Sequence, residues 1–252
     1  MSLDLTGLAV LLTGGAGAIG RVVADRLHAH GATVVVNDLL PDAEAADLLP
    51  AGVAYVRGDC ADDDAVERLL DEATARAGGP LQAVCCHAGA AVAHPIERFP
   101  TADFDRLFAT NVRAAFLLAR GAAARWRATG AGGHLVFTTS WVQDVPWPEI
   151  APYSATKAAL KSLTRSFARE LAPHGIRANA VAPGIVGVGM AKRQWDTEPS
   201  YRARAAKAVP LGRLQPPESV ADAFVFLLSP MASYMTGAVL LVDGGASLYP
   251  LD

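Results

Sequence analysis

The chain has 252 residues, of which 52% are hydrophobic and 19% charged, enough to bury the core of one α/β domain or of two small ones. A net charge of −3 and a pI of about 6.1, without any block of basic residues, argue against nucleic acid as the main ligand. The sequence has no apolar run of the ~18 residues that a membrane span requires, so we expect no membrane partner.

The three cysteines are Cys60, Cys85 and Cys86. Their odd number and the adjacent pair argue against a disulfide framework and fit a reducing compartment. Their spacing also fails every CxxC metal pattern, so we expect no metal site. Residues 1–5 lack a basic region followed by an apolar one, so we expect no signal peptide and a cytoplasmic protein.

The first predicted unit begins with an apolar run at residues 8–13, which is typical of a strand buried on both faces. A glycine-rich turn at residues 14–20 and a helical pattern to residue 29 follow, and a second strand at residues 33–36 leads into Asn37 and Asp38. This order is that of a dinucleotide-binding unit. We expect the turn to hold a pyrophosphate through backbone N–H groups at the helix N-terminus, and its candidate residues are Gly14, Gly17, Ala18 and Ile19.

Asp38 bears on the choice of cofactor. Its carboxylate can accept hydrogen bonds from the adenosine ribose hydroxyls and would repel a 2′-phosphate. Residues 15–17 contain no Arg or Lys to neutralise such a phosphate, and Leu39 follows the aspartate. The sequence therefore predicts NAD in preference to NADP.

Strand and helix patterns continue to alternate along the chain. Strands are predicted at residues 53–56, 81–86, 134–139, 177–181 and 239–242, and helices at 62–76, 101–126, from about 151 to 171, and 217–228. Residues 101–126 are long enough to form two elements. The alternation predicts one domain over residues 1–252, a Rossmann fold with a doubly wound parallel sheet of about seven strands and helices on both faces.

In such a fold, ligands bind at the carboxyl ends of the strands. The residues that follow the predicted strands are therefore candidates for the cofactor site: Asp59, Cys60, Ala88, Gly89, Pro183, Gly184 and Val186. We expect the polar stretch at residues 185–210 to form a mobile lid over the substrate, with Gly187 and Gly189 as hinges.

Tyr153 and Lys157 are four residues apart on a predicted helix and so share one face. A phenol has a pKa of about 10, and a nearby positive charge favours its ionised form. Tyr153 is therefore a candidate general acid or base. Taken alone the pair is a weak pattern, because a Tyr and a Lys on one helix face are common.

Together, these motifs resemble the short-chain dehydrogenase/reductase family over nearly the whole chain. The matching residues are Thr13 and Gly14 with Gly20, Asp59, Ala88-Gly89, Asn111, Ser140 thirteen residues before Tyr153, Lys157, and residues 179–184. The resemblance implies that Tyr153 exchanges the proton of the substrate hydroxyl while a hydride moves to or from the nicotinamide. It implies that Lys157 lowers the pKa of Tyr153 and holds the nicotinamide ribose.

The resemblance also implies that Ser140 bonds the substrate oxygen, that Asn111 helps to hold a water chain, and that the chain forms a homotetramer. Three positions depart from the family pattern. Ala18 replaces a glycine, Cys86-His87 replace two asparagines, and Val188 replaces a threonine that normally helps to hold the nicotinamide carboxamide.

The substrate is less constrained. Residues 144–148, and residues 234–237 through 249–250, are similar to bacterial glucose 1-dehydrogenases, but Val142 stands where those enzymes have a histidine. Trp141, Val142, Trp147 and Val188 predict an apolar pocket, which would leave the hydroxyls of a polyol unpaired. We therefore expect a secondary alcohol or ketone of mixed polarity. The alternatives are a sugar or polyol 1-dehydrogenase, a reductase of carrier-bound 3-oxoacyl groups, and a non-catalytic NAD-binding sensor.

Overall fold

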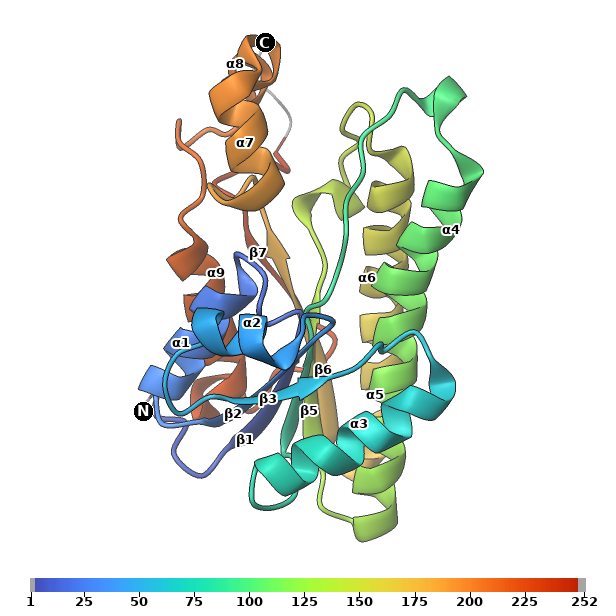
Figure 1. Ribbon diagram of the computed structural model, residues 1–252, viewed down its shortest axis with the longest axis vertical. Coiled ribbons are helices and arrows are strands. Elements are labelled where there is room, and N and C mark those ends of the chain that lie inside the picture. The colour runs from blue at the N-terminus through green and yellow to red at the C-terminus, as the bar shows by residue number, and fades with distance from the viewer. Residues whose placement is uncertain (1–2, 249–252) are drawn as a thin grey trace.

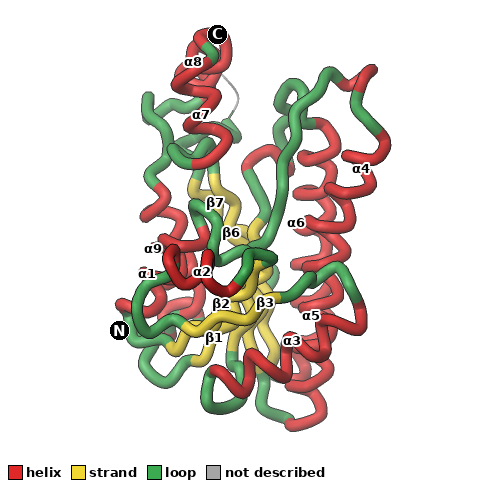
Figure 2. Tube along the Cα trace, viewed as in Figure 1, coloured by secondary structure: helices red, strands yellow, loops and turns green. Residues whose placement is uncertain are grey.

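One parallel sheet of seven strands forms the centre of the computed structural model, which describes residues 3–248 (Figures 1 and 2). The strands are β1 (Ala9–Thr13), β2 (Thr33–Asp38), β3 (Ala54–Arg57), β4 (Ala83–Cys86), β5 (Gly133–Thr138), β6 (Ile176–Pro183) and β7 (Val239–Val242). Their order in the sheet is β3-β2-β1-β4-β5-β6-β7. The chain therefore reverses direction across the sheet between β1 and β4, where doubly wound folds bind their ligands.

Helices cover both faces of the sheet. Figure 1 shows α1 (Gly20–Ala29), α2 (Asp42–Leu48) and α9 (Pro217–Leu228) on one side, and α3 (Asp63–Arg76), α5 (Ala114–Thr129) and α6 (Ala151–Leu171) on the other. The remaining helices are α4 (Thr101–Phe108), which continues toward α5, and the pair α7 (Gly189–Thr197) and α8 (Pro199–Ala208). The single-domain doubly wound architecture predicted from the alternating pattern is confirmed.

Side chains alternate along the strands and so pack into two separate hydrophobic cores, one on each face of the sheet. Leu11 and Val35 point into the core beneath α3, α5 and α6, whereas Val10, Leu12 and Val36 point into the core beneath α1 and α9. Because neighbouring residues of a strand face opposite sides of the sheet, a strand covered on both sides must be apolar throughout. All five residues of β1 are buried, which explains its continuous apolar run.

Most predicted elements lie within two residues of their observed bounds. Asp62 caps α3, since its side chain accepts hydrogen bonds from the backbone N–H groups of Asp64 and Ala65. The predicted helix at residues 101–126 consists of α4, a π-helical turn at Ala109–Arg113, and α5. The sequence does not predict α2, α7 or α8.

Within residues 3–248, no helix is both long and apolar enough to cross a membrane. Tyr249 and Pro250, part of the resemblance to glucose 1-dehydrogenases, lie outside the described residues.

Candidate active site

The glycine turn between β1 and α1 packs too closely for side chains. Gly14 has a φ of +68°, and a Cβ atom there would lie 2.7 Å from the Cα atom of Ala88. Its N–H donates to the carbonyl of Asn37 at the end of β2 (2.7 Å). Only a glycine adopts this backbone at such close range without strain. The turn is thereby fixed between the ends of three neighbouring strands.

The fit of this turn to a dinucleotide rests on its backbone donors. Ala18 and Ile19 lie just before α1, and within residues 3–248 their N–H groups donate to no acceptor. Free N–H groups at a helix N-terminus are suited to an anion, and the helix dipole adds to this attraction. Ala18 is half-buried and leaves these donors accessible. The turn therefore fits a pyrophosphate.

Asp38 lies at the carboxyl end of β2, next to the turn. Its carboxylate accepts one hydrogen bond from the backbone N–H of Ala16 (3.2 Å) and one from that of Leu39 (2.8 Å). These bonds fix the carboxylate while each oxygen keeps a further lone pair. The side chain is thus held as an acceptor for a hydroxyl.

The next strands contribute the predicted residues at the same edge. Asp59 is exposed and accepts from the N–H of Ala61, whereas the Cys60 thiol is buried and donates to Asn37 Oδ1 (3.1 Å). Burial raises the pKa of this thiol to about 12, so it stays protonated. After β4, the N–H of Ala88 donates to the hydroxyl of Thr13 (3.1 Å).

The candidate catalytic side chains meet at the ends of β4 and β5. Ser140 follows β5 and is hydrogen-bonded to the phenol of Tyr153 on α6. Lys157 lies one turn further on α6, with its Nζ 5.5 Å from the ring centroid of Tyr153. A Cβ atom on Gly89 would lie 3.4 Å from that Nζ. The structure thus brings Ser140, Tyr153 and Lys157 together beside the predicted cofactor residues.

The electrostatics of this cluster differ from the sequence-based expectation. Burial raises the pKa of Tyr153, and the hydrogen bond with Ser140 acts in the opposite direction but does not outweigh it. The expectation that Lys157 lowers the pKa below the ordinary value is therefore wrong for the protein alone. Burial also lowers the pKa of Lys157 to about 8, which weakens the positive charge that the expectation depends on.

Asn111 lies in the π-helical turn between α4 and α5 and is fully buried. Its Oδ1 accepts from the N–H of Ala90 (2.8 Å), and its Nδ2 donates to the carbonyl of Ala90 (2.9 Å) and to the hydroxyl of Thr156 (3.0 Å). The π-turn widens the helix at this point so that Asn111 bridges the loop after β4 and α6.

His87, one of the departures from the family pattern, is also tied to this network. Its Nδ1 is hydrogen-bonded to the hydroxyl of Thr138 (2.9 Å), whose carbonyl accepts from Lys157 Nζ (2.8 Å). Burial and the nearby Lys157 charge lower the pKa of His87 to about 4, so the ring is neutral. His87 therefore supplies the bracing that the usual asparagines would give.

Pro183 ends β6, and the segment that follows it is fixed by a residue that the sequence does not single out. Gln215 accepts from the N–H of Gly184 through its Oε1 (2.7 Å), and its backbone pairs with Val186. A buried glutamine followed by Pro216 and Pro217 is the only local signal for this role. Gln215 holds the β6–α7 segment in place at the candidate cofactor site.

An apolar wall stands beside the catalytic side chains. It consists of Trp141, Val142, Ile185, Tyr201, Ala205, Val209 and Ala246, and Trp147, Tyr153 and Trp195 pack against it. Three of the four predicted pocket residues therefore belong to one cluster. Val188 does not, because it packs against the core beneath α1 and α9. Its place in the pocket stays a prediction.

The predicted lid at residues 185–210 is largely helical. It contains α7 and α8, which we call the lid helices, and Figure 1 shows them at the carboxyl edge of the sheet, beyond β7. Tyr201 and Ala205 of α8 are buried in the wall, and the ring of Trp147 contacts the rings of Trp141 (centroids 5.3 Å apart) and Tyr201 (6.3 Å apart). Edge-on contacts of this kind stabilise aromatic clusters.

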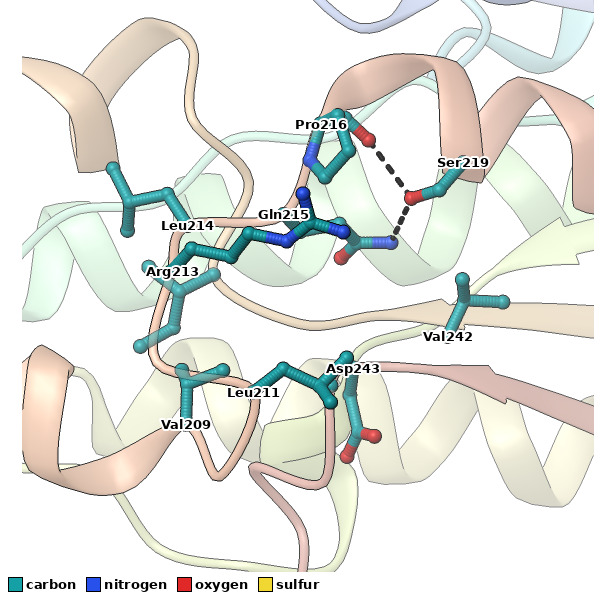
Figure 3. Close-up of a pocket in the computed structure, with 11 residues that line it drawn as sticks. Val209, Leu211, Arg213, Leu214, Gln215, Pro216, Ser219, Val242 and Asp243 are labelled. Atoms are coloured by element: carbon teal, nitrogen blue, oxygen red, sulfur yellow. Dashed lines mark hydrogen bonds between the residues drawn. The ribbon is translucent and has the colours of Figure 1, made fainter.

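A cavity of about 160 Å³ lies at the base of the lid helices, next to Ile185, Val209 and Leu214. Figure 3 shows its polar edge, where the hydroxyl of Ser219 accepts from Gln215 and donates to the carbonyl of Pro216. Its lining includes none of Ser140, Tyr153 and Lys157. The cavity is therefore distinct from the candidate catalytic side chains.

Known proteins resemble this chain over most of its length. A family model described as enoyl-(acyl carrier protein) reductase matches residues 14–247. The chain is 33% identical to 3β-hydroxysteroid dehydrogenase 1 of Eggerthella lenta, over 98% of this chain and 96% of that protein. It is 34% identical to glucose 1-dehydrogenase of Gluconobacter oxydans, over 96% of this chain and 93% of that protein.

Among solved structures, a gluconate 5-dehydrogenase from Burkholderia cenocepacia in complex with NADP and tartrate has a TM-score of 0.91 and 29% sequence identity. The superposition covers 98% of both chains. The likeness therefore extends over the sheet, the candidate site and the lid helices.

Proposed function

The chain belongs to the short-chain dehydrogenase/reductase family, and from this premise we propose that it is an NAD-dependent enzyme that interconverts a secondary alcohol and a ketone. The observation that supports the proposal most is the gathering of Ser140, Tyr153 and Lys157 beside a glycine turn with free N–H groups. Such a site can move a proton at one oxygen while a cofactor is held alongside.

The proton is moved by Tyr153. Burial raises the pKa of its phenol, so the protein without ligands holds it protonated, ready to donate to a ketone oxygen. In the reverse direction the phenolate accepts the proton of the alcohol. In the protein without ligands the hydroxyl of Ser140 is hydrogen-bonded to the phenol; with substrate bound it would instead donate to the substrate oxygen and stabilise the negative charge that develops there.

Lys157 and Asn111 have supporting roles. Lys157 is fixed by the carbonyl of Thr138 and would hold the nicotinamide ribose through its remaining N–H donors. Asn111 connects the loop after β4 to α6, beside the route by which a water chain would carry the proton to solvent.

The cofactor residues fit NAD. Its pyrophosphate would be bound by the turn, its adenosine by Asp38 and the segment after β3, and its nicotinamide by the segments after β4 and β6. The residues involved are Gly14, Gly17, Ala18, Ile19, Asp38, Asp59, Cys60, Ala88, Gly89, Pro183, Gly184 and Val186. The cofactor held there would accept a hydride as NAD or supply one as NADH.

A substrate and cofactor panel tests the proposal. Purified protein is offered sugars, polyols, cyclic ketones and steroids with NADH or NADPH in the reductive direction and NAD or NADP in the oxidative one. We expect turnover of a secondary alcohol or cyclic ketone, and a preference for the non-phosphorylated cofactor because Asp38 repels a 2′-phosphate. The Asp38→Ser variant should lose that preference. Faster turnover with NADPH by the parent protein would contradict the role of Asp38.

A sugar 1-dehydrogenase is the second candidate, favoured by the likeness to the Gluconobacter oxydans enzyme. The wall weighs against it, since Trp141 and Val142 are buried apolar side chains next to Ser140. Higher activity on glucose than on cyclic alcohols in the same panel would favour this second function.

We also propose that the chain assembles as a homotetramer in the cytoplasm and that the lid helices move when substrate binds. Phe116 of α5 is 39% exposed and contacts Phe167 of α6, which supports packing of these helices against a second copy. Light scattering during size-exclusion chromatography measures the assembly.

A further inference from the structure

The lid helices are basic although the whole chain is acidic. Residues 189–208 contain five basic side chains, Lys192, Arg193, Arg202, Arg204 and Lys207, and two acidic ones, Asp196 and Glu198. The whole chain has a net charge of −3, so positive charge is concentrated on the segment beside the candidate site. A local excess of one sign raises the concentration of ligands of the opposite sign.

Two of these charges have structural roles. Lys192 forms an ion pair with Asp196, one turn further on α7. Arg202 donates to the carbonyls of Trp195 (2.8 Å) and Asp196 (3.1 Å) near the C-terminal end of α7. Helix ends leave such carbonyls without partners, so Arg202 stabilises α7 itself.

Arg204 has neither role. Its guanidinium lies over the ring of Trp147, with Cζ 5.1 Å from the ring centroid, and it pairs with no carboxylate in residues 3–248. The side chain is exposed. Glu198 influences the pKa of the nearby Tyr201, as Arg204 does, yet forms no ion pair with Arg204. A guanidinium on an aromatic face keeps the N–H groups at its edge free for a planar anion.

The wall connects this guanidinium to the reacting atoms. Tyr153 packs against the wall, and Trp141 follows Ser140 directly. From Trp141, ring contacts lead to Trp147 (5.3 Å) and on to Arg204 (5.1 Å). A ligand that reaches from Tyr153 across Trp147 would therefore meet a cation that has no carboxylate partner in residues 3–248.

We propose that Arg204 binds a carboxylate of the substrate, so that the substrate is an alcohol or ketone with an apolar body and an acid group at its far end. This inference rests on the proposed function, because it names the substrate class of the same site. Two ring contacts separate Arg204 from Trp141, so the acid group is several bonds from the reacting carbon. We therefore expect a 2-hydroxy acid, whose carboxylate adjoins that carbon, to gain no affinity from Arg204.

Two other cations that form no ion pair in residues 3–248 can serve as controls. Arg193 is on α7. A Cβ atom on Gly189, the first residue of this helix, would lie 3.9 Å from the Cβ atom of Ala18 in the glycine turn. This helix therefore lies toward the proposed site of the cofactor phosphates. Arg213 lines the separate cavity at the base of the lid helices (Figure 3). Neither contacts Trp147, so both serve as controls of equal charge.

A matched series of ligands tests the proposal. Cyclohexanones that carry a carboxylate on an alkyl chain of increasing length are compared with their neutral methyl amides. Binding to the NAD-loaded protein is measured by calorimetry, because a ketone and NAD are both oxidised and cannot react. At the best chain length we expect the carboxylate to bind about tenfold or more tightly than its amide, the effect of a hydrogen bond to a charged group.

Variants test whether Arg204 causes the tighter binding of the carboxylate over the amide. Arg204→Gln should remove it, Arg204→Lys should keep part of it, and Arg193→Gln and Arg213→Gln should leave it intact. In reductive kinetics with NADH, Arg204→Gln should raise KM for the carboxylate ketone without changing kcat, because this contact is the same in the ground and transition states.

Several results would overturn the proposal: equal binding of the two ligands, binding of neither, a preference that survives Arg204→Gln, or one that is lost equally in either control. If the matching phosphonate bound more tightly than the carboxylate, and Arg204→Gln removed this difference, the carboxylate proposal would be wrong. The acid group of the substrate would then be a phosphate ester. Turnover of the neutral amide tests the proposed function separately. If amides are reduced without any carboxylate preference, only the substrate class is wrong; if carboxylates bind but no ketone is reduced, the proposed reaction is wrong.

Discussion

The two halves of the candidate site are built on different principles. In the catalytic cluster, Asn111 and Lys157 are at most 3% exposed, and their polar atoms are hydrogen-bonded to neighbouring elements. In the apolar wall, aromatic packing dominates: the ring of Trp147 contacts the rings of Trp141 and Tyr201, and Arg204 beside it has only a ring contact.

This difference suggests that one region governs the reaction and the other governs the choice of substrate. A buried network of hydrogen-bonded side chains has one low-energy arrangement, so it would fix the geometry that the proposed proton transfer requires. Packing contacts tolerate changes in shape and polarity at smaller cost. We therefore expect substitutions in the catalytic cluster to abolish the reaction, and substitutions in the wall to change what is turned over.

The largest effect is expected from Tyr153→Phe. Removing the proton donor should lower kcat by about 10²-fold or more, while NAD binding stays within about twofold of the parent value. Tyr201→Phe, which removes a buried hydroxyl from the wall, is the matched control and should keep most of the turnover. Steady-state kinetics and fluorescence titration with NADH measure both. Substantial activity in Tyr153→Phe would remove the distinction between the two regions.

The next effect concerns the buried charge of Lys157. Its pKa is lowered by burial from 10.5 to about 8, so the folded protein releases this proton more readily than the unfolded chain. Below pH 8 the lysine is charged in both states, and its burial destabilises the fold. As the pH rises from 8 to 10.5 this penalty is lost, so Lys157 should add on the order of 3 kcal/mol to the unfolding free energy.

Urea unfolding of the protein without cofactor measures this effect. The gain on raising the pH should shrink in Lys157→Met and persist in Lys161→Met, because Lys161 lies nearer the surface and pairs with Asp144. An identical pH dependence in the parent and Lys157→Met would show that the lysine is not desolvated.

A smaller effect is expected from Val142→His in the wall. Val142 is 4% exposed beside Trp141, and a histidine there would offer a hydrogen bond to a sugar hydroxyl. We expect kcat/KM for glucose to rise and that for a cyclic ketone to fall, each by roughly tenfold. Val188→His, which alters the opposite core, should leave this ratio unchanged. High activity on glucose in the parent protein would contradict an apolar pocket.

The smallest effect is expected at Glu149, between the wall and α6. It has a φ of 69°, a left-handed conformation that costs a residue with a Cβ atom ~1–2 kcal/mol. Glu149→Gly relieves this strain but adds freedom to the unfolded chain, so a net gain of up to about 1 kcal/mol is expected. Thermal unfolding should show a rise in Tm of a few degrees in Glu149→Gly and none in Glu149→Ala, which keeps the Cβ atom.

Local spacing in the sequence determines most of the fold and identifies the candidate catalytic residues. The apolar run of β1, the glycine turn and Asp38 predict the cofactor unit because each depends on neighbours within a few residues. Ser140, Tyr153 and Lys157 are recognisable for the same reason, since their spacing places them on a strand end and a helix face that must meet. The family and the fold follow from these patterns alone.

Only the tertiary structure decides the pKa values of the candidate catalytic groups and the composition of the apolar wall. The raised pKa of Tyr153 depends on burial that no five-residue pattern records. The wall combines segments near residues 141, 185, 205 and 246, and it excludes Val188, which the sequence places beside them. Apolar residues far apart in the chain have no common period, so their shared surface exists only once the sheet and the lid helices have brought them into contact.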